Sequence, residues 1–204
     1  YRIRTADRER YLEWFHDIHI PEKLARPGYT WAAHYEEINA AGDPAYVAFF
    51  GGSASRVFYD PSRAQLKPQQ NPQTREMMGL RVNGTNAIFV EEWQEQRAET
   101  TAPDTAAAIS LDCVSVAGHD EAFGVFVVQT LAPTLLQSDG ARAVHKWLNS
   151  AGKPRHAVLT TYRSVAVAEA NSPAWGSDNG KALQAQTERP YGNAFMAKRL
   201  WPPA

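Results

Sequence analysis

The sequence predicts a mixed α+β fold built from two β-α-β-β-α-β repeats with antiparallel sheets. Three observations lead to this prediction. A helical pattern of apolar residues over positions 7–20 is followed directly by an alternating, strand-like pattern. Motifs of the first half return in the same order in the second half. The 204 residues are 44% hydrophobic and 21% charged, which is the composition of an ordinary globular protein.

The internal repeat rests on four sequence matches that keep their order along the chain. The matched pairs are residues 20–24 with 132–136, Gly28 with Gly140, residues 33–44 with 144–154, and residues 86–93 with 193–201. Four matches in register indicate a tandem duplication. We predict repeats over residues 1–99 and 105–204, with the boundary in the polar stretch 97–104.

The first predicted element is an amphipathic helix over residues 7–20. Its apolar face carries Tyr11, Trp14, Phe15, Ile18 and His19. Spacings of three, four, seven and eight residues place these side chains on one side of a helix. Asp7 is a candidate N-cap. We expect Pro21 to end or kink the helix, because proline lacks a backbone donor and crowds the preceding turn.

The first repeat continues with three strands and a second helical region. Aromatic and small residues alternate over residues 29–37, and after the turn at 40–44 a second strand follows at 46–50, which together predict a hairpin. Residues 53–78 predict helices interrupted by prolines, and residues 86–94 predict the closing strand.

The second repeat shows the same order with one strand more. It predicts a strand at 107–116, a helix at 120–136, a hairpin at 141–167, an irregular helix, and a last strand ending at residue 200. This is the ferredoxin-like β-α-β-β-α-β unit. By the same logic the first repeat should also begin with a strand. Residues 1–5 could supply only its tail, so we expect that strand to be shortened or to lie upstream.

Bulky residues occupy both phases of several strands, for example Val47 and Phe49 beside Tyr46 and Phe50. A sheet with helices on one face therefore needs a cover on the other, and we expect the two sheets to pack face to face as a barrel with an internal cavity. The duplication would supply this pairing within one chain. A monomer is then sufficient, and a homodimer stays open.

Charge and composition exclude several classes of partner. Lys and Arg number 21 and Asp and Glu 22, so no basic excess predicts binding to nucleic acid or to a membrane surface. No apolar run approaches the ~20 residues of a membrane-spanning helix. The single cysteine, Cys113, cannot form an internal disulfide, and we expect a cytoplasmic protein.

The segment WFHDIHIPEKL at 14–24, followed by Pro27-Gly28 and an aromatic-rich strand, resembles the signature W-Y-x-x-x-H-I-P-E-x-L-x-x-P-G. That signature belongs to the dimeric α+β barrel superfamily, and the branch it resembles is the ethyl tert-butyl ether degradation (EthD)-like group. The resemblance implies a fused pseudo-dimer. It also implies activities such as cofactor-free monooxygenation, isomerisation, cyclisation or dehydration. Leu131 and Thr134 replace His19 and Glu22 in the second repeat, so only the first would carry a working site.

His19 is the first candidate catalytic residue, because imidazole exchanges protons near neutral pH. The structural alternative is that His19 bonds a carbonyl and fixes the end of the helix. We expect the substrate to lie against Trp14, Trp31, Tyr35 and Tyr46. His34 is the second catalytic candidate if it faces the barrel interior. Its counterpart His145 favours a structural role for both histidines.

Metal and cofactor sites have little support in the sequence. His16 and His19 are three residues apart and could share a helix face, but no third metal ligand lies near them. Haem has no supporting motif, and no hydrolase or nucleotide-binding motif occurs. Cys113 has no neighbouring base and reads as a buried strand residue. We expect neither a metal nor a cofactor.

The sequence therefore predicts a small-molecule enzyme, or a pocket protein derived from one. Its chemistry would be cofactor-independent proton transfer, of the isomerase, dehydratase, cyclase or monooxygenase type, on a small apolar or aromatic carbonyl compound. The alternative is a non-catalytic ligand-binding or assembly module of the same fold, in which His19 is structural. The environment of His19 distinguishes the two.

Overall fold

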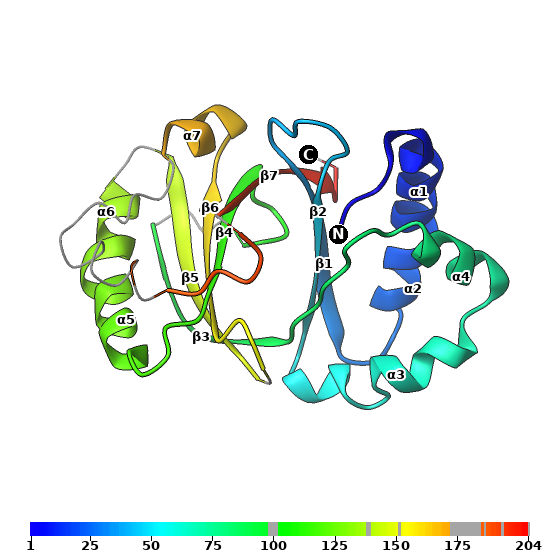
Figure 1. Cartoon of the computed structure of the whole chain (residues 1–204), viewed down its shortest axis with the longest axis horizontal. Helices are drawn as coiled ribbons and strands as arrows, with labels where there is room; N and C mark the ends of the chain where they lie inside the picture. The colour runs from blue at the N-terminus through cyan, green and yellow to red at the C-terminus, as the bar shows by residue number, and fades with distance from the viewer. Residues whose placement is uncertain are drawn as a thin grey trace. The chain divides into compact units, whose positions relative to one another are not determined.

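The structure is a computed structural model that describes residues 1–97, 102–137, 140–150, 152–171, 185, 187–192 and 194–203. The chain divides into two compact units. The first comprises Tyr1–Asn86 and Arg199–Ala204, and the second comprises Ala87–Lys198. Figure 1 shows the helices and strands of both units.

In the first unit, a helical run leads into an antiparallel hairpin. The run consists of η1 (Thr5–Asp7), α1 (Arg8–Trp14), the π turn η2 (Phe15–His19) and α2 (Ile20–Leu24). The hairpin is formed by β1 (Tyr29–Glu37) and β2 (Tyr46–Gly52), as predicted. After it come η3 (Ser55–Phe58), α3 (Arg63–Leu66), η4 (Lys67–Gln69) and α4 (Pro72–Gly79).

Of the two outcomes expected at Pro21, an end of the helix is wrong, because the helix continues through Pro21 to Leu24. Pro21 lies in the first turn of α2, where the missing N–H costs little. The π turn η2 comes directly before it, and wider turns of this kind locally change the helical hydrogen-bond pattern. Asp7 precedes α1 but makes no capping bond; its Oδ1 accepts from Arg10 Nε at 3.2 Å.

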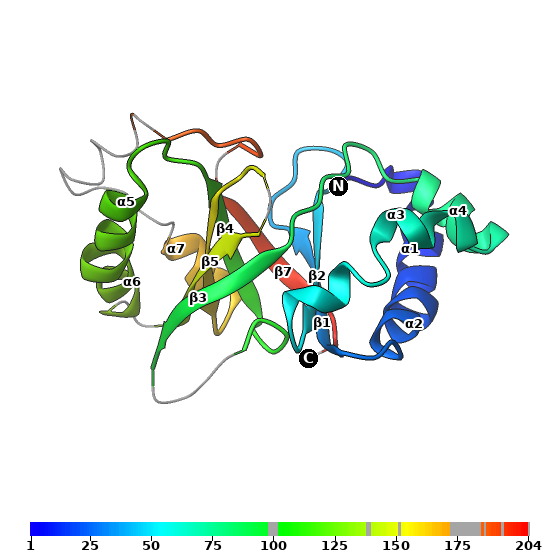
Figure 2. The ribbon, with the colours of Figure 1, turned by 90° about the horizontal axis from the view of Figure 1, so that it is seen from below.

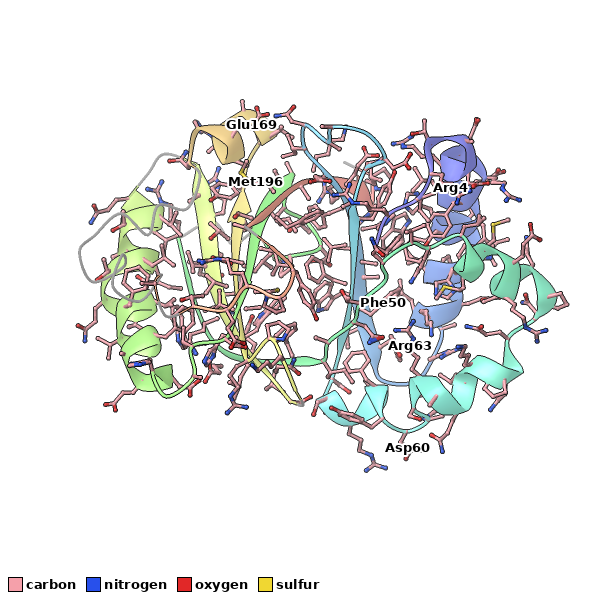
Figure 3. All side chains as sticks on the ribbon, viewed as in Figure 1. Arg4, Phe50, Asp60, Arg63, Glu169 and Met196 are labelled. Atoms are coloured by element: carbon pink, nitrogen blue, oxygen red, sulfur yellow. The ribbon has the colours of Figure 1, made fainter. Side chains whose placement is uncertain are left out.

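The core of the first unit lies between these helices and one face of the hairpin. Ala32 of β1 and Tyr46 of β2 are buried against helix residues there. Phe50 points from β2 toward the same side (Figure 3). The other members of this core are Ile3, Tyr11, Trp14, Phe15, Ile20 and Met77. Alternate residues of β1 and β2 therefore face the helices, and the residues between them face the other way.

The second unit contains a longer antiparallel sheet with a long helical run packed against it and a short helix besides (Figure 2). Its strands are β3 (Phe89–Gln96), β4 (Ala108–Val114), β5 (Ala141–Asn149), β6 (His156–Tyr162) and the first part of β7 (Phe195–Trp201), in the order β7-β4-β6-β5-β3. Its helices are α5 (Asp120–Phe126), the π turn η5 (Val127–Leu131), α6 (Ala132–Gln137) and α7 (Val165–Ala170).

The mixed α+β class with antiparallel strands is confirmed. Two strands, β3 and β7, do not lie wholly in the unit that corresponds to their predicted repeat. The closing strand predicted for the first repeat, β3, pairs with β5 in the second unit. The last part of β7, Arg199–Trp201, belongs to the first unit, where the strand order is β2-β1-β7. The repeat boundaries at 1–99 and 105–204 stay a prediction, and residues 98–101 lie outside the described chain.

At the start of the chain, Arg2 forms single β-bridges with Ala45 and Val82. Tyr46 N–H also donates to the Tyr1 carbonyl at 2.7 Å. These bonds place Tyr1 and Arg2 beside the beginning of β2. Within the described residues, no helix combines the length and the apolar character that crossing a membrane requires.

Candidate functional site

His19 is the last residue of the π turn η2, and its imidazole is buried with only 7% of its surface exposed. The ring packs against Trp14 at 4.7 Å and Phe15 at 5.3 Å between ring centroids. Its Nδ1 is buried, and no described residue gives it a hydrogen bond. Burial lowers the pKa of His19 to about 3, and the neighbouring charges of Lys23, Arg81 and Arg26 add to this effect. The imidazole is therefore neutral at pH 7.

The π turn explains how two aromatic rings reach the same imidazole. In a regular α-helix, residues five apart such as Trp14 and His19 point about 140° away from each other. A π turn bonds residue i to residue i+5 and so brings that pair to one side. Phe15, four residues before His19, lies on this side as well. The structural alternative expected His19 to bond a carbonyl at the helix end. Its Nδ1 makes no such bond.

His34 lies in β1, is fully buried and bonds through both of its nitrogens. Its Nε2 lies 2.7 Å from the Tyr1 hydroxyl and its Nδ1 lies 2.8 Å from His16 Nε2. Either neutral tautomer of His34 satisfies both contacts, with one ring nitrogen donating and the other accepting. Burial lowers the pKa of both His34 and His16. The result is a continuous polar chain from Tyr1 to the half-buried His16.

Phe15 lies between the two histidine environments. Its ring centroid is 4.7 Å from that of His34, with edge-to-face geometry, and 5.3 Å from that of His19. His19 and His34 thus share a neighbour and belong to different polar surroundings. His34 faces the helices and not the helix-free side of the sheet, so the condition for a catalytic role stated above is not met.

Tyr46 supports the polar chain. Its ring stacks on His34 at 5.3 Å, and its hydroxyl donates to Glu36 Oε1 at 3.0 Å. Arg8 Nη2 donates to the same carboxylate oxygen at 2.8 Å. Burial, with Glu36 adding to it, raises the pKa of Tyr46 to about 12, so the hydroxyl keeps its proton. Tyr46 therefore holds its neighbours in place next to His34.

Trp31 and Tyr35 lie on the opposite face of β1. Both pack against Phe49 of β2, with ring centroids at 6.4 Å and 6.1 Å. Gly51 makes room for Trp31, because a β-carbon there would lie 1.9 Å from the indole nitrogen. The structure brings Trp14, His34 and Tyr46 to the helix side of the hairpin together with His19, and it does not bring Trp31 and Tyr35 there.

Arg81 is a neighbour of the site that sequence reasoning missed. Its guanidinium lies 4.3 Å from the ring centroid of Tyr1 and 5.2 Å from that of Phe15. Its Nε donates to the Tyr11 hydroxyl at 2.6 Å. Arg81 follows α4, far along the chain from the helix it touches, and no local motif marks it. Its partners Tyr11 and Phe15 could have been predicted as site residues from the sequence, because both lie on the predicted apolar helix face.

The second unit carries different groups at the matching places. Leu131, aligned with His19, is 4% exposed and packs in an apolar core. His145 Nδ1 lies 2.7 Å from Glu91 Oε2, and the same oxygen accepts from Trp147 Nε1 at 3.1 Å. Burial raises the pKa of Cys113 to about 12, in keeping with its expected role as an inert buried residue. In the described parts of both units, no group of three or more His, Cys, Asp or Glu side chains could hold a metal ion.

Comparison with known proteins shows similarity of fold. No family profile matches the sequence, and no curated protein matches it. Among solved structures, a candidate monooxygenase from Fusobacterium nucleatum has a TM-score of 0.57 at 10% identity, over 98% of this chain and 88% of that one. An anthrone oxidase-like protein has a TM-score of 0.56 at 12% identity, over 98% and 89%. A candidate monooxygenase from Lactobacillus acidophilus has a TM-score of 0.52 at 12% identity, over 97% and 89%. The chain shares their fold.

Proposed function

We propose that the protein is a small-molecule enzyme in which neutral His19 acts as a general base on a small apolar or aromatic carbonyl compound. One observation carries this proposal: a buried imidazole nitrogen without a partner, held between two aromatic rings. Leaving such a group unpaired costs about 1–3 kcal/mol. Buried nitrogens without a partner also occur at His145 and His156 in the second unit, and His19 is distinguished from them by its place between two aromatic rings and beside three cations. In this proposal Trp14 and Phe15 form the walls against which the substrate lies.

His19 in the empty site is a weak base, because burial and the surrounding cations disfavour its charged form. Removing a proton from the substrate leaves an anion beside the new imidazolium, and an opposite charge at close range raises the pKa of that imidazolium. The cations that disfavour protonation in the empty site also stabilise the anion. Proton transfer is therefore coupled to the formation of an enolate or phenolate.

The fate of this anion separates the reaction types. In an isomerase or dehydratase a proton returns at another atom, whereas in a cofactor-free oxygenase the anion reacts with dioxygen. Similarity in fold to two candidate monooxygenases and an anthrone oxidase-like protein supports the second route. We propose His34 and Tyr46 as positioning residues, since they act on the site through Phe15 and His16.

We also propose that the chain is a tandem pseudo-dimer of the dimeric α+β barrel superfamily, in its EthD-like branch. Support comes from three features that recur in both halves: a π turn followed directly by a helix with proline as its second residue, a glycine with positive φ, and an antiparallel hairpin. The glycines are Gly28 at φ 87° and Gly140 at φ 114°.

The proton-transfer function is tested with anthrone and 1-tetralone, two aromatic ketones with acidic C–H groups. We expect the full chain to accelerate deuterium exchange at these carbons in D2O, or oxygen uptake with anthrone. His19→Gln should lower the rate about 10²–10⁴-fold, the usual contribution of a general base. His119→Gln, at an exposed position in the second unit, is the matched control and should leave the rate within about twofold.

An unchanged rate in His19→Gln would remove the proposed role of this residue. Binding of either ketone with no exchange and no oxygen uptake would instead favour the alternative, a ligand-binding module in which His19 is structural.

A further inference from the structure

Four basic side chains gather near Lys23 in the first unit, and three of them, Lys23, Arg26 and Arg81, also act on His19. We call Lys23, Arg26, Arg63 and Arg81 the cationic cluster. Lys23 has its pKa lowered to about 8 by burial and by the other three members. The one acidic residue that opposes this effect is Glu22. In the described chain, no member of the cluster forms a salt bridge with a carboxylate.

An unpaired cluster of this kind is unusual inside a protein, because like charges at short range repel one another. Fully solvated cations would explain it, but Lys23, Arg26 and Arg81 are each half-buried. Arg63, at the start of α3, lies close enough to Lys23 to lower its pKa (Figure 3). The cluster therefore holds positive charge in a region that water screens only in part.

Three buried nitrogen atoms in the same unit lack hydrogen-bond partners. They are Trp14 Nε1, His19 Nδ1 and Arg26 Nη1. Trp14 and His19 are 3% and 7% exposed, so solvent does not serve them. An indole N–H and a guanidinium N–H can only donate, and they require acceptor atoms. The missing partner is thus a molecule rich in acceptors, and the cluster requires that it be negative.

Arg26 also lines a hollow next to the cluster. The hollow has a volume of about 320 Å³, roughly ten times the volume of one water molecule. Its other lining residues are Pro27, Tyr29, Val57, Asp60, Pro61 and Leu66, most of which are apolar. Asp60 is the one acidic group, and its carboxylate lies 3.7 Å from Arg56. The hollow can hold the apolar body of a molecule whose charged end reaches Arg26.

We propose that the cationic cluster and this hollow bind an organic carboxylate, with the carboxylate on the cluster and the apolar body against Tyr29, Val57 and Leu66. This deepens the proposed function: the molecule on which His19 acts would carry a permanent negative charge besides the one that forms during proton transfer. Two carboxylates, Glu22 beside Lys23 and Asp60 in the hollow, oppose the four cations, and Asp60 has Arg56 as its own partner, which leaves the cluster with a positive excess.

The test measures binding, and so does not depend on turnover. Isothermal titration calorimetry of the full chain compares 2-naphthoate with its neutral counterpart 2-naphthamide and with inorganic phosphate. We expect 2-naphthoate to bind at least about tenfold more tightly than either, because the amide lacks the charge and phosphate lacks the apolar body. Raising the salt concentration should weaken 2-naphthoate binding, since the exposed part of the cluster is screened.

Variants locate the binding. Arg26→Gln and Lys23→Gln should each lower the affinity for 2-naphthoate about tenfold or more. Lys67→Gln, an exposed cation just after α3, is the matched control and should change the affinity less than twofold. The midpoint of urea unfolding is measured for each variant. If Arg26→Gln does not fold, Lys23→Gln carries the test, because Lys23 belongs to the cluster and is not one of the residues that line the hollow.

Equal affinities for 2-naphthoate and 2-naphthamide would overturn the proposal, as would unchanged affinity in both variants. Phosphate binding as tight as that of 2-naphthoate would overturn the assignment of the hollow. The proposed function can fail separately: tight 2-naphthoate binding together with no His19-dependent exchange would leave a carboxylate-binding module. The reverse result, His19-dependent exchange without binding of the carboxylate, would leave an enzyme for neutral ketones.

Discussion

The two π turns of the molecule are equal in backbone and opposite in chemistry. Phe15–His19 and Val127–Leu131 each have five residues, and each is followed by a helix whose second residue is proline. The first turn ends in a buried histidine with an unpaired nitrogen, and the second ends in a leucine packed in a core. The backbone form therefore recurs in both halves, whereas a histidine ends the turn in the first half alone. The proposed function uses this difference.

The first strands of the two hairpins, β1 and β5, differ in which side chains face the helices. Sequence matching pairs His34 with His145, but His34 packs on helix residues, whereas Val144 rather than His145 faces the helices of the second unit. Counting from Gly28 and Gly140, the residue in the place of His34 is Lys146, whose Nζ lies 5.9 Å from the ring centroid of Phe123 in α5. A one-residue offset reverses the face of every side chain. The recurring histidine is therefore no evidence for a shared structural role.

The largest expected effect concerns the two matched glycines. A β-carbon at Gly28 would lie 2.4 Å from Val57 Cγ1, and one at Gly140 would lie 2.4 Å from Val167 Cγ1. Gly28→Ala and Gly140→Ala should each lower the free energy of unfolding by about 2–4 kcal/mol, from positive φ and steric overlap together. Urea unfolding measures this.

Gly118→Ala is the control for these glycines, because its φ is 77° but nothing lies within 4 Å of the added carbon. It should cost only about 1 kcal/mol. If either matched glycine cost no more than Gly118, that position would not be needed by the fold, and the correspondence between the halves would be broken there.

The two histidines matched by sequence should differ when each is replaced by leucine. His34→Leu leaves the Tyr1 hydroxyl and His16 Nε2 without their partner and should cost about 1–3 kcal/mol. His145→Leu leaves Glu91, whose side chain is 42% exposed and can turn to water, and should cost less than about 1 kcal/mol. Measuring the free energy of unfolding of both variants tests this difference. Equal losses would show that His34 and His145 contribute equally to stability.

Replacing His19 by leucine should make the free energy of unfolding depend less on pH, because leucine, the residue at the matching place in the second half, does not bind a proton. The unfolded chain protonates His19 near pH 6.5, and the folded protein does so only near pH 3. Below pH 6.5 the unfolded state therefore binds a proton that the folded state does not, so this residue lowers stability as the pH falls. The slope is at most about 1.4 kcal/mol per pH unit.

His19→Leu should remove this slope between pH 6 and 4 while leaving stability at pH 7 unchanged or higher. Leu131→Met, at the matching place in the second half, is the control and should keep the original slope. Thermal unfolding at a series of pH values measures both. An unchanged slope in His19→Leu would show that His19 protonates equally well in the folded protein.

The smallest expected difference lies at two helix N-caps. Asn71 Oδ1 accepts from Thr74 N–H at 2.7 Å at the start of α4, and Ser164 Oγ accepts from Val167 N–H at 3.3 Å at the start of α7. Asn71→Ala should cost about 1 kcal/mol and Ser164→Ala about 0.5 kcal/mol. Melting temperatures can resolve these changes, with the exposed Gln73→Ala as control; the reverse order would contradict the use of bond length as a guide.

The sequence predicts the helices and strands whose formation depends on local residue patterns. Apolar periodicity predicts the first helix, and alternation predicts the strands found at Tyr29–Glu37 and Tyr46–Gly52. It also marked His19 and Trp14, which the structure brings into contact. The continuation past Pro21 was missed because a π turn has no known residue pattern of its own, and proline was read by its usual effect in a regular helix.

The rest of the site depends on distant contacts. Arg81 reaches Tyr11 and Phe15 only because the chain after α4 returns to the first helix, and no spacing in the sequence reveals this. The orientation of His34 depends on strand register, for which a single residue is decisive. Local patterns thus gave the elements and the central residue, and packing selected its neighbours.

The π turn at Phe15–His19 holds one residue more than a regular helical turn. Deleting one residue between Trp14 and His19 would leave the two four residues apart, and a regular α-helix places such side chains only about 40° from each other. The contact between the indole and the imidazole can therefore exist with or without the extra residue, and alignments of related chains should allow a gap of one residue in this helix.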